Sequence, residues 1–221
     1  MIISLSIAEN PLSVGIFKNQ VLELTRLLSG ISWLAVRYLA FNKPFGVLST
    51  FTDTAGRPTL KDYIDTPGVY SAGRLDFDSE GLLLLSDDGE FIHLLTDPNF
   101  HLPKTYLVQV EGVVTAEALA KLKGGVVIQG RRTQRCQVMQ VPDPDLALRD
   151  KPITPHGLVS WLRIVLREGK KRQIRHMTAA VGLFSLRILR VAIGSLTLQD
   201  LAPGQWREMS QAEVEMLRRK K

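Results

Sequence analysis

Three carboxylates alternate in one short segment of the chain, at Asp76, Asp78 and Glu80. The apolar run at residues 82–85 follows this segment and predicts a buried strand. A carboxylate beside such a strand is expected to be partly desolvated and to need a nearby cation. A carboxylate held in this way can attack an anomeric carbon or stabilise a developing oxocarbenium charge, which is the chemistry of glycosyl transfer.

Two other interpretations of the same segment depend on what surrounds it. Alternating acids followed by Gly81 resemble the start of an EF-hand calcium loop, but that loop needs an oxygen ligand and an entering helix where the apolar residues 82–85 stand. A solvated acidic turn is the simpler alternative, because aspartate, serine and glycine are common turn residues. The residues of the segment alone leave this second alternative open.

Basic and acidic residues are gathered in different parts of the chain, whose net charge is +6. Residues 53–97 hold ten acidic and three basic residues, whereas residues 163–175 hold six basic residues and one acidic residue. We expect the fold to bring the two regions together, so that the basic segment supplies the cation that the carboxylate needs. A gathered set of cations also favours a nucleic-acid partner, with a solvated helix face as the alternative.

Composition limits the class of protein and its compartment. The chain has 221 residues, 45% of them hydrophobic and 23% charged, which is typical of a folded globular protein. Cys136 is the only cysteine in the sequence, which excludes an internal disulfide and a multi-thiolate zinc site and favours a reducing compartment such as the cytoplasm. The apolar stretch at residues 27–36 is far shorter than the roughly 20 residues that span a bilayer, so no membrane anchor is expected.

Hydrophobic periodicity predicts short strands that single helices interrupt irregularly. Without a steady βαβ alternation, this order favours the α+β class with a mixed or antiparallel sheet. Residues 1–36 show no sustained period and are expected to be an extension, and the proline-rich residues 142–157 are expected to be a loop. Strands are predicted at residues 38–41, 82–85, 104–111, 126–128, 161–166 and 186–191, and helices at residues 115–122, 170–181 and from 211 onward.

The segment GRLDFDSEGLLLLSD at residues 73–87 resembles the signature of the bacterial rRNA pseudouridine synthases. Further blocks follow in that family's order, FNKP from Phe41, KTY from Lys104 and EGKKRQIR from Glu168, and the resemblance covers about residues 38–209. The chain is most similar to the type E branch of the large-subunit synthases, which lacks an S4 RNA-binding domain. It departs from the family's pattern at His176, where relatives carry a second arginine.

The resemblance implies a pseudouridine synthase fold of the α+β class, with a mixed, largely antiparallel sheet that helices flank and no S4 domain. It implies an extension at residues 1–36, a catalytic domain at 37–212 and a basic tail at 213–221. The implied activity is isomerisation of a specific uridine of 23S rRNA to pseudouridine, without cofactor or metal. The implied partner is 23S rRNA or an assembling large subunit, and the implied state is a monomer.

The resemblance also implies a role for individual residues. Asp76 would be the nucleophile that loosens the C1'–N1 bond, after which the uracil turns and rejoins through C5. Base flipping is required, because C1' and C5 are not both accessible in a stacked helix. Arg175 would pair with Asp76, or alternatively contact a phosphate. Tyr106 would stack on the extruded base, with simple core packing as the alternative.

RNA contacts are implied for further basic residues. Arg74 would enter the space that the flipped nucleotide vacates, with a local salt bridge to a neighbouring carboxylate as the alternative. Lys43 is expected to support the fold rather than the chemistry. Phosphate contacts are expected from Lys170, Lys171 and Arg172.

Two hypotheses compete with this function. One is a non-catalytic RNA-binding or ribosome-assembly protein, and the other is a sister synthase with a different RNA target.

Overall fold

The computed structural model describes residues 36–97, 99–100, 102–147, 149 and 151–219. The chain from Arg37 onward forms one compact unit. Apart from Val36, the extension predicted at residues 1–36 lies outside the described residues and stays a prediction. Within the described part of the chain, no helix is long and apolar enough to cross a membrane.

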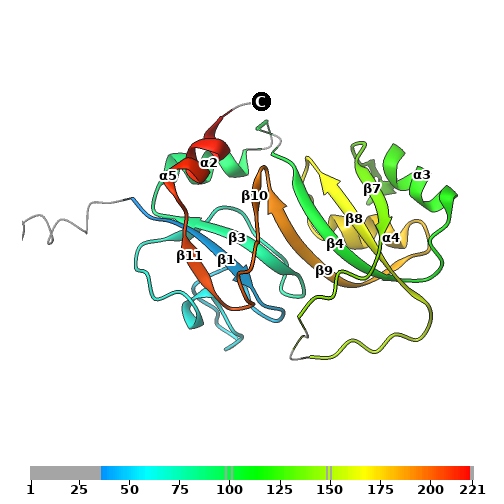
Figure 1. The fold of residues 1–221 in the computed structure, drawn as a ribbon, viewed down its shortest axis with the longest axis horizontal. Coiled ribbons are helices and arrows are strands. Elements are labelled where there is room, and N and C mark those ends of the chain that lie inside the picture. The colour runs from blue at the N-terminus through cyan, green and yellow to red at the C-terminus, as the bar shows by residue number, and fades with distance from the viewer. Residues whose placement is uncertain (1–35, 98, 101, 148, 150, 220–221) are drawn as a thin grey trace, which may run out of the picture. The chain divides into compact units, whose positions relative to one another are not determined.

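A nine-stranded sheet is the centre of the fold, with seven of its strands in the order β11-β1-β3-β9-β4-β8-β7 (Figure 1). Short β2 pairs with β3, and short β10 pairs with β9. Among the described strands, β3 and β9 pair in parallel and the other neighbours are antiparallel, so the predicted mixed, largely antiparallel sheet is confirmed. The strands are β1 (Tyr38–Lys43), β2 (Tyr70–Ser71), β3 (Glu80–Ser86), β4 (Lys104–Glu111), β7 (Gln137–Val141), β8 (Val159–Leu166), β9 (Phe184–Ile193), β10 (Leu196–Thr197) and β11 (Trp206–Glu208), with a separate hairpin of β5 (Val127–Ile128) and β6 (Arg131–Arg132).

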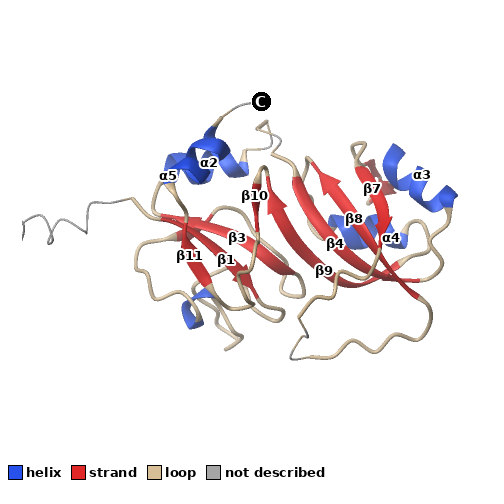
Figure 2. Cartoon of the chain, in the orientation of Figure 1, coloured by secondary structure: helices blue, strands red, loops and turns tan. Residues whose placement is uncertain are grey.

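Helices flank both halves of the sheet (Figure 2). Helix α2 (Gly89–Thr96) contacts β3 and α5 (Gln211–Arg218), whereas α3 (Ala116–Gly124) contacts β7 and α4 (Gln173–Ala179) contacts β9. A single 3-10 turn, η2 (Leu60–Asp62), lies in the connection between β1 and β2. Together with the sheet, these helices confirm the α+β class.

Local sequence signals explain where two of the helices begin and end. Thr115 accepts a hydrogen bond from the backbone of Ala118 and caps α3, which Gly125 ends with a positive φ of 86°. Ser210 and Glu213 form the predicted capping box at the start of α5. These helix positions are therefore encoded locally.

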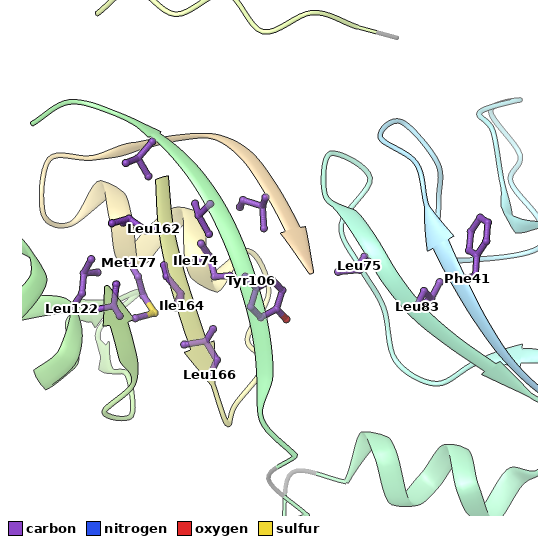
Figure 3. Close-up of a cluster of buried hydrophobic side chains, with 14 of the residues drawn as sticks. Phe41, Leu75, Leu83, Tyr106, Leu122, Leu162, Ile164, Leu166, Ile174 and Met177 are labelled. Atoms are coloured by element: carbon purple, nitrogen blue, oxygen red, sulfur yellow. The ribbon is translucent and has the colours of Figure 1, made fainter. Parts of the chain in front are cut away.

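Strand β3 is fixed from both faces of the sheet. Leu83 and Leu85 belong to a core cluster that extends to α3 and α4, part of which Figure 3 shows. Leu82 and Leu84 face the other way and pack with residues of α2 and α5. Because all four leucines are at most 1% exposed, the segment that precedes β3 is attached to one of the most firmly packed elements of the fold.

Gly81 at the start of β3 permits a close approach to β9. Its φ is +103°, and a Cβ built on it would lie 2.3 Å from the carbonyl oxygen of Arg190. A larger residue cannot occupy this position without displacing the backbone of β9. The glycine therefore fixes where the acidic segment enters the sheet.

Candidate active site

The acidic segment forms a loop between β2 and β3 whose backbone is held on both sides. The Ser49 hydroxyl donates to the carbonyl of Leu75 at 2.8 Å and accepts from its N–H at 3.0 Å. The N–H of Gly46 donates to the carbonyl of Phe77 at 2.9 Å, and the N–H of Ser79 donates to that of Asp76 at 3.0 Å. These hydrogen bonds hold the backbone of the loop in place. The loop is therefore not a freely solvated turn.

Asp76 is half-buried in this loop, and its carboxylate makes no hydrogen bond or ion pair with any residue that the structure describes. The predicted ion pair between Arg175 and Asp76 is not observed. Arg175 instead lies 3.1 Å from Asp78, measured from Nη2 to Oδ2. The same nitrogen donates to the main-chain carbonyl of Asp78 at 2.9 Å, and Nη1 donates to that of Ser185 at 3.0 Å.

Two arginines of α4 and its N-cap converge on Asp78. Arg172 donates from Nη1 and Nη2 to the two carboxylate oxygens, at 3.0 Å each. Arg172 is the N-cap of α4, with a positive φ of 52°, and Arg175 lies in the first turn of the helix; their side chains meet at one carboxylate. Burial opposes ionisation of Asp78, but the hydrogen bonds from Arg172 and the charge of Arg175 outweigh it and hold the pKa of this carboxyl below its usual range.

Glu80, the first residue of β3, is neutralised in a similar way. The Arg187 guanidinium donates to both of its oxygens, at 3.0 Å from Nε and 2.8 Å from Nη2. Arg149, from the proline-rich loop, lies 3.6 Å from the same carboxylate and stacks over the Phe45 ring at 4.1 Å. Sequence reasoning did not single out Arg187 or Arg149, because no local pattern connects either residue with the signature.

Tyr106 occupies β4, opposite Ile164 of β8 and Arg190 of β9. Its side chain is 9% exposed and belongs to the same cluster as Ile174 and Leu75 (Figure 3). Tyr106 therefore packs in the core, and only the small exposed part of its side chain is accessible to a base.

Lys43 is buried at the end of β1 and supports the loop connection, as predicted. Its Nζ donates to the carbonyls of Pro44 at 2.9 Å and Val47 at 2.7 Å. Burial lowers the pKa of Lys43 to about 8, although the charge of Glu80 partly opposes this effect.

The basic residues predicted to contact RNA differ in what they contact. Arg74 is exposed, and no salt bridge between it and a described carboxylate is observed. Lys170 lies 3.4 Å from Glu168, and Lys171 is exposed. The Arg172 guanidinium binds Asp78 and is not free to hold a phosphate in this structure.

His176, where the sequence departs from the family's pattern, lies one residue beyond Arg175 on α4. Its Nε2 is 3.4 Å from Nε2 of Gln129, in the turn between β5 and β6. The side chain thus points to the small hairpin, and the described partners of Asp78 are Arg172 and Arg175.

Comparison with known proteins gives a consistent result. A family model described as RNA pseudouridylate synthase matches residues 37–180. The chain is 46% identical over 176 residues to the ribosomal large subunit pseudouridine synthase E of Vibrio vulnificus, covering 79% of this chain and 75% of the relative. It is 51% identical over 167 residues to the protein of the same name from Xanthomonas axonopodis, covering 73% and 88%.

A more distant relative and a solved structure carry names of the same kind. The chain is 34% identical over 183 residues to the ribosomal small subunit pseudouridine synthase A of Escherichia coli, covering 80% of this chain and 72% of the relative. A crystal structure of a pseudouridylate synthase superimposes with a TM-score of 0.71 at 30% identity, covering 83% of this chain and 74% of the other.

Proposed function

Since this chain belongs to the RNA pseudouridylate synthase family and is therefore an isomerase, we propose that it converts one specific uridine of 23S rRNA to pseudouridine, with Asp76 as the nucleophile. The choice of the large ribosomal subunit is supported by the identity of 46% and 51% to relatives named for that subunit, against 34% to a relative named for the small subunit.

The observation that carries the assignment of Asp76 is the different treatment of the three loop carboxylates. Asp78 and Glu80 are ion-paired with arginines that come from distant parts of the chain. Asp76 lies between Leu75 and Phe77 on a hydrogen-bonded backbone, yet none of the described residues pairs with its carboxylate. A fixed, half-buried and unneutralised carboxylate is what nucleophilic attack on a sugar carbon requires.

The proposed reaction balances without a redox partner. The Asp76 carboxylate forms a bond to C1' as the C1'–N1 bond breaks, and the uracil leaves with that electron pair. The uracil then turns, C5 bonds to C1', and the carboxylate departs with its electrons. The proton on C5 is lost to solvent and N1 gains a proton. The charges of Arg172 and Arg175 and the charge of Asp76 interact through space, without an ion pair between them.

Base flipping belongs to the same proposal, because the carboxylate must reach C1' and the uracil must turn outside the stack. Tyr106 would contact the extruded uracil with the exposed part of its ring. Arg74, which is exposed two residues before Asp76, would enter the space left in the RNA.

Tritium release tests the proposed function. The purified protein is incubated with 23S and 16S rRNA transcripts that carry tritium at uridine C5, because forming the new bond at C5 must expel that hydrogen. We expect about one release per 23S transcript and none from 16S rRNA, as expected for a site that accepts one flipped nucleotide. Release from 16S rRNA alone would overturn the substrate assignment, and no release from rRNA or assembly intermediates would favour the non-catalytic RNA-binding hypothesis.

A further inference from the structure

A groove with a volume of about 730 Å³ lies apart from the acidic loop, over the strands β4, β7 and β8. Thr105, Val165 and Gln137 form one row across these strands, because each is the register partner of the next. Arg163 and Met139 form a second row on the same side of the sheet. Side chains alternate between the faces of a sheet, so the groove lies on the face opposite to Tyr106.

The groove is strongly basic. Among the described residues, four cationic side chains and no acidic one line it, from α3, the β6–β7 connection, β8 and the position after β8: Lys123, Arg135, Arg163 and Arg167. Within the described part of the chain, Lys123, Arg135 and Arg163 form no ion pair or hydrogen bond through their side chains, and all three are exposed. Unpaired cations gathered around a concave surface attract an anion.

The arginines near the acidic loop differ from the cations of the groove, because they are ion-paired. Arg172, Arg175 and Arg187 are each engaged by Asp78 or Glu80 at 3.1 Å or less. Within the basic segment 163–175, Arg172 and Arg175 pair with Asp78, whereas Arg163 and Arg167 line the groove. The groove therefore holds exposed positive charge that the loop carboxylates do not neutralise.

We propose that this groove binds the phosphate backbone of the substrate RNA at a segment other than the one that presents the target uridine. The inference rests on the proposed function. Arginines and lysines spread around a groove match the repeated charges of a nucleic-acid backbone, with each cation neutralising about one phosphate. Val165 and the exposed Met139 add apolar surface for a ribose.

In the plane of the sheet, the groove lies a few strands from the acidic loop. One row of register partners runs across β3, β9, β4 and β8. It consists of Gly81, Arg190, Tyr106 and Ile164, in that order. The row through Thr105 and Val165 is the next one along the strands. With neighbouring strands about 4.8 Å apart, the groove lies roughly 14 Å across the sheet from the start of β3. Contacts there position the RNA without reading its sequence.

The test measures RNA affinity against salt concentration. A variant that carries Lys123→Gln, Arg135→Gln and Arg163→Gln is compared with the unchanged protein for binding of a fluorescein-labelled RNA stem-loop. We expect the slope of log Kobs against log[KCl] to become shallower by about 2 to 2.7, because each lost phosphate contact removes about 0.7 to 0.9. By the same relation, affinity at 0.15 M salt falls roughly 50- to 150-fold.

A second triple variant removes the same charge outside the groove and serves as the matched control: Lys61→Gln, Lys121→Gln and Arg219→Gln. We expect its slope to stay within about 0.5 of the unchanged protein, because long-range attraction by net charge is screened at physiological salt. An unchanged slope for the groove variant, or an equal loss in both variants, would overturn the proposal. Tritium release by the unchanged protein tests the proposed function separately, so the two failures are distinguishable.

Discussion

Replacing Asp78 by asparagine tests how much the ion pairs beside the nucleophile contribute to stability and turnover. The substitution keeps the shape of the side chain but removes the charge that holds Arg172 at 3.0 Å and Arg175 at 3.1 Å. Breaking a buried ion pair costs about 3–5 kcal/mol and losing an exposed one about 0–1 kcal/mol. The Asp78 and Arg175 side chains are 28% and 17% exposed, so we expect a loss of about 2–3 kcal/mol.

Urea unfolding at neutral pH measures this loss, and Glu117→Gln is the matched control. Glu117 pairs with Lys121 on the surface of α3, with 76% of its side chain exposed, and its substitution should leave the unfolding midpoint nearly unchanged. The lowered pKa of Asp78 also gives the sign of the pH dependence. The stabilisation from Asp78 is complete above the ordinary pKa of an aspartate, near 4, and is lost as pH falls through the lowered pKa of the folded state. The difference in the free energy of unfolding between the unchanged protein and Asp78→Asn should therefore shrink below about pH 4.

Turnover should fall together with stability in the Asp78→Asn variant. Arg172 and Arg175, no longer neutralised, would turn toward Asp76 and reduce its nucleophilicity by at least about tenfold in rate. Tritium release at saturating RNA measures this effect. The reasoning is refuted if Asp78→Asn unfolds at the same midpoint as Glu117→Gln and turns over at the rate of the unchanged protein.

Substitutions at Gly81, Arg175 and Lys43 give further expectations. Gly81→Ala should destabilise the fold by more than about 3 kcal/mol in urea unfolding, because the new Cβ would meet the carbonyl of Arg190; a loss below about 1 kcal/mol would contradict this packing. Both Arg175→Ala and Arg175→Lys should slow tritium release at least about tenfold, since the single nitrogen of an ammonium cannot occupy both positions from which Nη1 contacts Ser185 and Nη2 contacts Asp78; wild-type rates in both would exclude a role. In a Cys136→Ser background, the free energy of unfolding should rise above about pH 8 by up to about 1.4 kcal/mol per pH unit for Lys43, because the unfolded state keeps a proton that the folded state has lost. The rise in the free energy of unfolding should be smaller when Lys43→Gln is added to the Cys136→Ser protein. An equal rise with and without Lys43→Gln would contradict the lowered pKa of Lys43.

The fold could be predicted where local signals agree with packing. The alternation at Lys104–Glu111 corresponds to β4, and the Thr115 and Gly125 signals correspond to the ends of α3. Helix α2 was not predicted, because Gly89 at its first position and Asp88 as its N-cap look like a turn in the sequence. Its burial against β3 and α5 stabilises it, and tertiary packing of that kind leaves a weak local signal.

The composition of the site was predicted better than its pairing. The sequence identified a carboxylate loop and a basic segment that would meet, and they do. It assigned Arg175 to Asp76 instead of Asp78, because the choice between two acids two residues apart depends on how the loop backbone turns. Arg149 and Arg187 reach Glu80 from 69 and 107 positions further along the chain, and no periodicity connects such distant residues.

The measurement that tests the central claim most directly is tritium release by Asp76→Asn on C5-labelled 23S rRNA, with RNA affinity measured on the same preparation. The substitution removes the nucleophile's charge and leaves its size and the loop backbone unchanged. We predict that release falls at least about a thousandfold while RNA affinity survives. Release within about tenfold of the unchanged protein, at intact RNA affinity, would contradict the assignment of Asp76 as the nucleophile.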